Sequence, residues 1–418
     1  MLNSWRWFGP HDPVSLRDIR QAGVTDVVSS LHHLACGAPW EDEAIQQRIR
    51  EIEWDPIGQR PSGLRWGVVE SLPVHEDIKT RSGDFQHHID VYKQNLRRLG
   101  THGIKIVCYN FIPVLDWART DLNVEQADGS TVSSCNVDAF VAFDLFVLKR
   151  PGAENSYAPW MIQSAKAFYE GLSAQTQAEL TQSLLLGLPG TVDDLTVEVF
   201  KTRLARYQTV DDATLRENLY QFLREVMPVC EEVGVKMCIH PDDPAYPVFG
   251  VPRVLSRRSD VAQLFEAVPS PHNGLTLCTG SFGSCIDNDP AQMFEEFADR
   301  VFFVHFRNVT HVPGKPGSFY ESNHLFGSVD MPRAMKALIL EEERRKARGD
   351  AEPRIPVRPD HGKLMDGDKD SGAYPGYSRT GRMIGLAELR GLEVGIRHAL
   401  GLSVEDASAH HTQEKADA

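Results

Sequence analysis

The segment VKMCIH at residues 235–240 is a short apolar run that ends in a histidine. Three later segments have the same design: LTLC ends at Cys278, VFFVH ends at His305, and RIPVRPD ends at Asp360. Short apolar runs bounded by glycine, proline and polar residues are typical of buried parallel strands. Four successive strands that each end in a potential metal ligand predict a metal site at the C-terminal face of a barrel.

Strand and helix patterns alternate along the chain on both sides of these segments, which indicates a parallel sheet. Eight strands, each followed by a helix, predict a (β/α)8 TIM barrel that forms one catalytic domain over residues 1–400. The alternative, an open doubly wound sheet, lacks a Gly-rich dinucleotide fingerprint after any strand. The predicted strands are 5–9, 24–30, 64–71, 104–110, 235–241, 275–280, 301–308 and 354–360, and the predicted helices are 13–22, 41–53, 84–100, 212–233, 259–268, 290–299, 330–348 and 380–400.

A long connection separates the fourth and fifth predicted strands. A structureless loop of that length is improbable, so we expect a mostly helical insertion over 115–210, with helices near 158–186 and 194–207, that caps the barrel mouth. A smaller polar insertion, to which we assign no role, and a Gly-rich loop follow later in the chain. These two segments span 309–328 and 362–378, and a polar tail spans 401–418.

Composition limits the classes of partner. The 418 residues carry a net charge of −14, which argues against binding to nucleic acid or to an anionic membrane. No segment is apolar over the length that a membrane span requires, and the N-terminus lacks a signal-peptide pattern. Seven cysteines, three of them inside predicted strands, favour a cytoplasmic protein with free thiols. We also expect a homo-oligomer.

Each potential ligand has a simpler interpretation when it is taken alone. A histidine that ends a strand, such as His240, often only hydrogen-bonds a backbone carbonyl, and a strand cysteine such as Cys278 is usually a buried structural residue. Two imidazoles, a thiolate and a carboxylate together suit a divalent transition metal and argue against Mg²⁺. Mn²⁺ or Fe²⁺ would leave coordination positions for a substrate, whereas Zn²⁺ with four protein ligands would form a closed, structural site.

Potential catalytic groups lie next to the ligands. His361 directly follows Asp360 at the end of a strand, where it can turn over the mouth as a general acid or base, or be an exposed turn histidine. Tyr377 lies on the Gly-rich loop and is a candidate acid, with Tyr374 as the alternative. Arg358 shares a strand face with Asp360, and its guanidinium can hold a carboxylate with two hydrogen bonds.

An anionic substrate would need local positive charge in so acidic a protein. Glu70 and His75 follow the third strand, where they either line the mouth or fix the turn. For the arginines of the first strand and of the insertion, a solvated surface charge is the simpler interpretation. The candidate substrate-binding residues are Arg6, Asn110, Arg150 and Arg307.

The sequence resembles the mannonate dehydratases over residues 5 to 392. The stretches that carry the resemblance include IHPDDP at 239–244, LCTGS at 277–281, RPDHG at 358–362 and PGYS at 375–378. The resemblance implies a xylose-isomerase-like TIM barrel and a divalent metal, usually Mn²⁺ and in some members Fe²⁺. It further implies dehydration of D-mannonate to 2-dehydro-3-deoxy-D-gluconate in glucuronate breakdown.

The same resemblance assigns roles to residues. It implies that the metal ligands are His240, Cys278, His305 and Asp360, and that the acid–base groups are His361 and Tyr377. A base would remove the C2 proton, the metal and Arg358 would stabilise the enediolate, and an acid would protonate the departing C3 hydroxyl. The alternatives are a metal-dependent sugar isomerase or epimerase on the same barrel, and a non-catalytic sugar-acid sensor.

Overall fold

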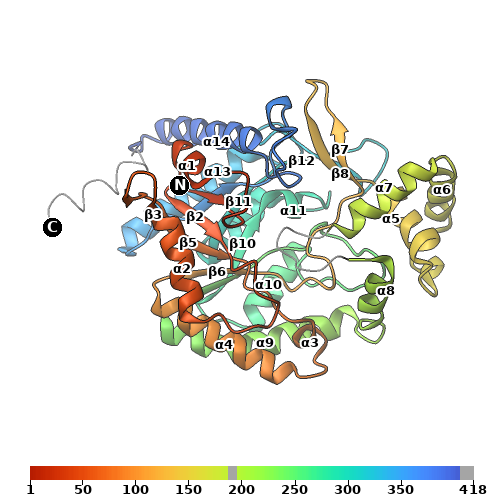
Figure 1. Ribbon diagram of the computed structural model, residues 1–418, viewed down its shortest axis with the longest axis horizontal. Helices are drawn as coiled ribbons and strands as arrows, with labels where there is room; N and C mark the ends of the chain where they lie inside the picture. Colours follow the sequence, from red (N-terminus) through yellow and green to blue (C-terminus); the bar gives the residue numbers. More distant parts are fainter. Residues whose placement is uncertain (187–194, 405–418) are drawn as a thin grey trace.

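Eight parallel strands close into a barrel in the computed structural model, which describes residues 1–186 and 195–404 (Figure 1). The strands are β1 (Leu2–Arg6), β2 (Asp26–Ser29), β5 (Arg65–Glu70), β6 (Ile106–Tyr109), β9 (Lys236–Ile239), β10 (Asn273–Cys278), β11 (Val301–Phe306) and β14 (Pro356–Pro359). Their order around the barrel, β1-β14-β11-β10-β9-β6-β5-β2, is the order of the chain, and this confirms the predicted (β/α)8 barrel.

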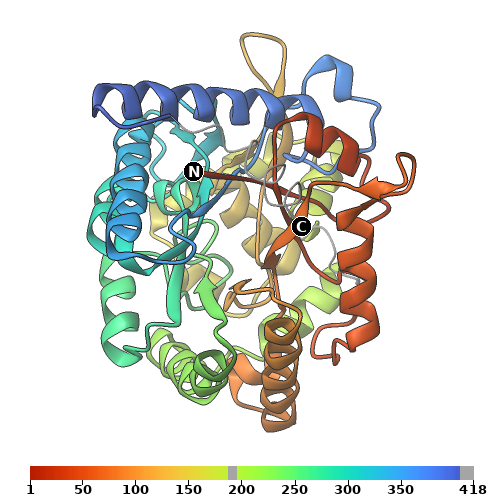
Figure 2. The same cartoon turned by 90° about the vertical axis from the view of Figure 1, so that its left-hand side faces the viewer.

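Helices cover the outside of the barrel, as Figures 1 and 2 show. Each buries one face, as an amphipathic helix does; in the helix Phe85–Thr101, for example, Ile89, Tyr92, Leu96 and Leu99 point inward. None of the helices in the described ranges is long and apolar enough to cross a membrane. The barrel helices are α1 (Leu16–Gln21), α2 (Asp42–Glu53), α3 (Glu76–Thr80), α4 (Phe85–Thr101), α9 (Asp212–Val233), α10 (Arg258–Ala267), α11 (Thr279–Gly283), α12 (Pro290–Phe297), α13 (Met331–Arg348) and α14 (Arg379–Ala399), with 3-10 turns at Ala298–Arg300 and Asp366–Asp368.

The first strand begins earlier than predicted. The sequence suggested 5–9, but β1 spans Leu2–Arg6 because its N-terminal end pairs with β14, where Leu2 lies opposite Pro356. The N-terminal ammonium group is 3.2 Å from the carboxylate of Glu342, which fixes the start of the strand. Gly9, at a φ of +105°, leads the chain away from the sheet.

The insertion after β6 is mostly helical and lies to one side of the barrel (Figure 1). It begins with a hairpin that the sequence did not reveal, formed by β7 (Asp121–Glu125) and β8 (Thr131–Cys135). Parts of the segments predicted near 194–207 and at 401–418 lie outside the described residues. The helices of the insertion are α5 (Val137–Ala142), a π-helical turn (Phe143–Leu148), a 3-10 turn (Ala153–Ser156), α6 (Pro159–Glu170), α7 (Ala174–Leu185) and α8 (Val197–Ala205).

The polar segment 309–328 also contains strands, namely β12 (Val309–His311) and β13 (Phe319–Glu321). They join the hairpin of the first insertion in a four-stranded sheet with the order β12-β13-β8-β7. Two insertions that are far apart in the sequence therefore form one structure beside the barrel mouth. A third hairpin, with strands of two residues each, pairs β3 (Trp54–Asp55) with β4 (Arg60–Pro61).

The interior of the barrel is packed with side chains that alternate along the strands. Val28, Val68, Cys108, Cys238 and Phe303, from five different strands, form one buried cluster. In a strand, the residue two positions further on points to the same side. This rule places Glu70, Asn110, His240 and His305 in the layer above the cluster, at the C-terminal ends of their strands.

Candidate metal and active site

Four potential ligands meet at the C-terminal ends of β9, β10, β11 and β14. Ligand atoms of His240, Cys278 and His305 all lie within 4.8 Å of one another. The carboxylate of Asp360 joins them, since its Oδ2 is 3.8 Å from the Sγ atom of Cys278. Cys278, His305 and Asp360 are buried, and His240 is half-buried. The structure thus brings together all four residues that the sequence suggested as ligands.

The nitrogen and sulfur atoms of this cluster suit a transition metal. The Nδ1 atom of His240 donates to the carbonyl oxygen of Pro241 at 2.7 Å, which leaves Nε2 as the lone-pair nitrogen. The Nε2 atom of His305 is buried and makes no aligned hydrogen bond in the part of the chain that the structure describes, although Glu70 Oε2 lies 3.5 Å away. Ser281 donates its backbone N–H and its hydroxyl to the Cys278 sulfur, at 3.4 and 3.0 Å. The set fits a soft-to-borderline divalent ion.

A buried charge cluster lies beside these ligands. Glu70 accepts from Arg358 Nη2 at 2.9 Å and is 2.7 Å from Arg6 Nη1, while Arg358 also binds Asp360. Burial favours the neutral form of both carboxyls, but the neighbouring guanidinium groups hold the pKa of Glu70 and of Asp360 well below the usual range. The cluster therefore keeps two carboxylates and two arginines charged at the barrel mouth.

His361 and Tyr377 face each other next to the ligands. Their ring centroids are 5.3 Å apart, and His361 Nε2 is 3.8 Å from Asp360 Oδ1. Burial, together with the charge of Asp360, raises the pKa of Tyr377, so the phenol keeps its proton at neutral pH. The hydroxyl of Tyr374 instead donates to the carbonyl of Leu186 at 3.3 Å. Tyr377, and not Tyr374, is the tyrosine with its ring against His361.

A second charge cluster adjoins His361 and was missed by the sequence analysis. Arg307 is 2.6 Å from Asp243 Oδ2 and 2.7 Å from Glu321 Oε1. Arg119 lies 3.0 Å from Asp243 and 2.8 Å from the same Glu321 oxygen. Despite burial, the arginines lower the pKa of Asp243 to about 2 and hold that of Glu321 well below its usual value. Arg307, suggested as a substrate ligand, already has two carboxylate partners of its own chain.

The other three residues suggested to bind the substrate do not all lie at the barrel mouth. Arg6 ends β1 at the mouth, and Asn110 directly follows β6, where its side chain lies near the half-buried Asp116. Arg150 lies in the insertion, where its Nη2 atom is 2.7 Å from Asp144. Arg6 and Asn110 therefore belong to the barrel mouth, whereas the charge of Arg150 is paired inside the insertion.

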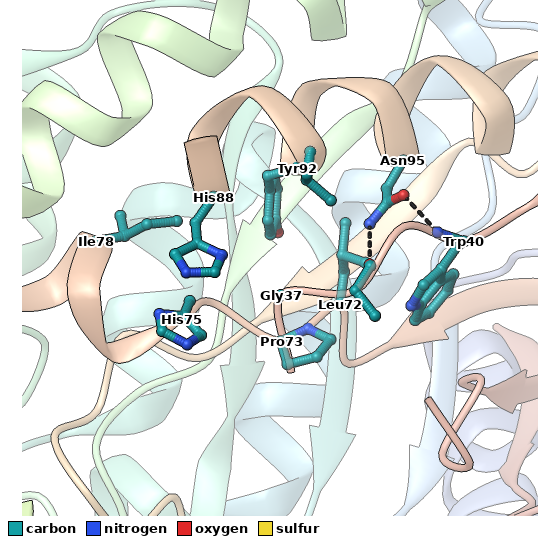
Figure 3. A pocket seen from close by; sticks show the side chains of 11 residues that line it. Gly37, Trp40, Leu72, Pro73, His75, Ile78, His88, Tyr92 and Asn95 are labelled. Atoms are coloured by element: carbon teal, nitrogen blue, oxygen red, sulfur yellow. Dashed lines mark hydrogen bonds between the residues drawn. The ribbon is translucent and has the colours of Figure 1, made fainter. Parts of the chain in front are cut away.

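A second histidine cluster, drawn in Figure 3, is formed by His75 at the start of α3 and His88 in α4. The rings of His75 and His88 are stacked with centroids 3.6 Å apart and an interplanar angle of 21°. Nδ1 of His75 accepts from the backbone N–H of Asp77 at 3.2 Å and so caps helix α3, and Asp77 binds Arg206. Ligand atoms of His75, Asp77 and His88 lie within 4.8 Å of one another, but Nδ1 of His75 is engaged by the cap and Asp77 by Arg206. His75 therefore fixes the turn after β5, one of the two roles left open for it.

A closed parallel barrel that carries a His-Cys-His-Asp donor set, with the rings of His361 and Tyr377 beside it at the C-terminal mouth, has the architecture of a TIM-barrel enzyme. The sequence model of D-mannonate dehydratase (UxuA) matches residues 1–401. The mannonate dehydratase of Marinomonas sp. (strain MWYL1) is 47% identical over 400 residues, covering 96% of this chain and 100% of that protein. The chain belongs to the D-mannonate dehydratase family, whose enzymes are hydro-lyases.

Further comparisons agree. The mannonate dehydratase of Chromohalobacter salexigens is 47% identical over 397 residues, covering 95% of this chain and 99% of that protein. The crystal structure of mannonate dehydratase from Streptococcus suis serotype 2 superposes with a TM-score of 0.74 at 31% identity, covering 97% of this chain and 96% of that one. The similarity therefore extends over the insertions as well as the barrel.

Proposed function

We propose that this protein dehydrates D-mannonate to 2-dehydro-3-deoxy-D-gluconate and water, the step expected in glucuronate breakdown. The proposal assigns a divalent ion, Mn²⁺ or Fe²⁺, to His240, Cys278, His305 and Asp360. The observation that carries it is the convergence of these four side chains at the barrel mouth beside His361 and Tyr377, in a chain of this family. An ion held there would supply Lewis acidity that favours loss of the proton next to the substrate carboxylate.

The chain's own residues provide charge and orientation for the reaction. Arg358 is held by Glu70 and Asp360, so its positive charge is fixed at the mouth before a substrate arrives. A preorganised cation in a buried site stabilises negative charge as it develops on the substrate carboxylate. Arg6 adds a second guanidinium on the same carboxylate of Glu70, at 2.7 Å. Despite burial, the charges of Asp360 and Glu70 hold the pKa of Arg358 well above its usual value.

The two facing rings supply the proton transfers. His361 takes the C2 proton at a ring nitrogen, and the C–H electron pair forms the C2–C3 double bond. Tyr377 gives its phenolic proton to the C3 hydroxyl, which leaves as water, and the resulting enol becomes the 2-keto acid. The raised pKa of Tyr377 favours its role as the acid, because the phenol is protonated when the hydroxyl departs.

We expect the enzyme to be located in the cytoplasm. All seven cysteines are free, and this supports a reducing compartment. The homo-oligomeric state stays a prediction, which size-exclusion chromatography with light scattering would test.

One experiment tests the proposed function directly. The purified protein, loaded with Mn²⁺ and incubated with D-mannonate, should release a 2-keto-3-deoxy acid that NMR detects, and removal of the ion by a chelator should stop the reaction reversibly. Recovery of an epimer alone, or a protein that turns over without metal, would contradict the proposal.

The ligand assignment has its own test. His240→Ala should lose bound metal and turnover together, because it removes one of the nitrogens of the cluster. The control is His102→Ala, at a histidine that pairs with Asp42 outside the site, and this variant should keep both properties. A fully active His240→Ala protein would remove that residue from the site.

A further inference from the structure

We propose that Glu321 is a positioning residue that acts through His361: its carboxylate selects the ring tautomer that carries the proton on Nδ1 and leaves Nε2 open toward the ligand cluster. This inference rests on the proposed role of His361 in proton transfer. The Oε1 atom of Glu321 is 3.2 Å from His361 Nδ1, while Nε2, on the other side of the ring, is 3.8 Å from Asp360. The two ring nitrogens thus face two different groups.

Glu321 is a fixed carboxylate. It ends strand β13, where its backbone pairs with Val309 of β12, and only 3% of the residue is exposed. Arg307 donates its Nε to Oε2 at 2.7 Å and its Nη2 to Oε1 at 2.7 Å, and Arg119 donates to Oε1 at 2.8 Å. A carboxylate with this many charged donors is ionised and has little freedom to turn. It can therefore only accept a hydrogen bond from the imidazole beside it.

The ring of His361 has little freedom as well. Trp117 packs edge-on against it, with centroids 5.7 Å apart and planes at 90°, and Tyr377 packs on it at 5.3 Å. Nδ1 and Oε1 are within hydrogen-bond distance but not aligned as a hydrogen bond. Catalytic hydrogen bonds often tighten only when the substrate is bound. The carboxylate then decides which nitrogen carries the proton, as the orienting carboxylate of a catalytic triad does.

If Glu321 only neutralised the neighbouring arginines, replacing it and replacing Asp243 should have the same effect on turnover. Glu321 neutralises Arg119 and Arg307, and so does Asp243, which is 3.0 Å from the first and 2.6 Å from the second. The two carboxylates differ in their contact with His361: in the part of the chain that the structure describes, Glu321 lies 3.2 Å from its Nδ1 atom, and Asp243 forms no ion pair with it. Asp243→Asn is therefore the matched control for Glu321→Gln, because both remove one negative charge from the same pair of arginines.

The kinetic test compares these two variants in the Mn²⁺ enzyme with D-mannonate. Glu321→Gln should lower kcat by about 10²-fold, the low end of what one positioned acid–base group contributes, with KM and metal content unchanged. Asp243→Asn should lose comparable stability toward urea with a much smaller loss of kcat than Glu321→Gln. In a His361→Gln background, the added Glu321→Gln substitution should cost no further kcat, because both act as one unit. Equal losses of kcat in the two single variants, or full additivity with His361→Gln, would overturn the proposal.

Two further measurements test the proposal if Glu321→Gln does not fold or if D-mannonate is not turned over. Should Glu321→Gln not fold, Glu321→Asp retains the charge near the arginines but withdraws it from His361, and an unchanged kcat there would refute the role. Imidazole ¹⁵N shifts of the Zn²⁺-loaded, histidine-labelled protein report the tautomer without any turnover. The His361 signal is assigned from its loss in His361→Gln, and in the wild type it should show a protonated Nδ1. A proton on Nε2 instead would refute the proposal, even if D-mannonate is not the substrate.

Discussion

Glu70→Gln is the substitution whose effect the structure defines most clearly. The side chain is 9% exposed and lies 2.7 Å from Arg6 Nη1 and 2.9 Å from Arg358 Nη2. Glutamine has nearly the same shape but no charge, so Arg6 loses its carboxylate partner and Arg358 keeps only Asp360. Breaking a buried ion pair in this way costs about 3–5 kcal/mol, because an uncompensated charge stays buried. That is a large part of a typical total stability of about 5–15 kcal/mol.

The pH dependence of this loss follows from the lowered pKa of Glu70. Its folded-state pKa lies well below the ordinary value of 4.5, so its ionisation contributes stability that is fully present above that value. The contribution disappears as the pH falls through the folded-state pKa. The difference in unfolding free energy between wild type and Glu70→Gln should therefore be constant near neutral pH and shrink in acid.

Urea denaturation followed by tryptophan fluorescence, in the presence of a chelator, measures this difference. The matched control is Glu217→Gln, which removes a carboxylate 3.1 Å from Arg224 where both side chains are 49% exposed. An exposed pair of this kind contributes about 0–1 kcal/mol. If Glu70→Gln shifted the unfolding free energy no more than Glu217→Gln does, the account of the buried charge cluster would be wrong.

Three other predictions concern the site and the core. Tyr377→Phe should lower kcat by about 10²–10⁴-fold while metal content and folding stay normal, and an unchanged kcat would exclude the phenol as the acid. Gly376→Ala should reduce turnover without metal loss, because a Cβ at this position would lie 3.1 Å from the His361 ring. The control is Gly372→Ala, at a glycine that has a similar positive φ but open space around it, and this variant should not affect the site. Equal losses of turnover in the two variants would argue against displacement of His361. Phe222→Ala should lower the unfolding free energy by about 3–5 kcal/mol, since the ring is fully buried among other aromatic side chains, and thermal unfolding that matches wild type would contradict this packing.

Local patterns were sufficient to predict the barrel and most of the residues at its mouth. The predicted helix 212–233 coincides with α9, because an aspartate cap, an apolar face and a terminal glycine all mark it in the sequence. His240 and His305 could be placed because strand alternation fixes which side chains share a layer. Glu70 was noted as a residue of the mouth or of the turn, and only the structure shows its contacts with Arg6 and Arg358.

The second charge cluster could not be predicted in the same way. Glu321 ends a strand of three residues in a polar segment, too short to show a period of two, and its ion-pair partner Arg119 is far from it in the sequence. The hairpin Asp121–Cys135 was missed for a related reason, since its exposed edge strand β7 carries few apolar residues. Long-range pairing of short polar strands leaves no periodic signal in one sequence.

The small sheet beside the mouth has a consequence for how members of this family can diverge. Strands β8 and β13 come from loops after two different barrel strands, yet they pair with each other, and Arg119 and Glu321 interlock across them. Exchanging or shortening either loop alone would remove one partner of the ion pair between Arg119 and Glu321, next to His361. The two loops should be inherited as one module, so a chimera that borrows only one of them from a distant homologue should assemble a barrel in which His361 is disordered.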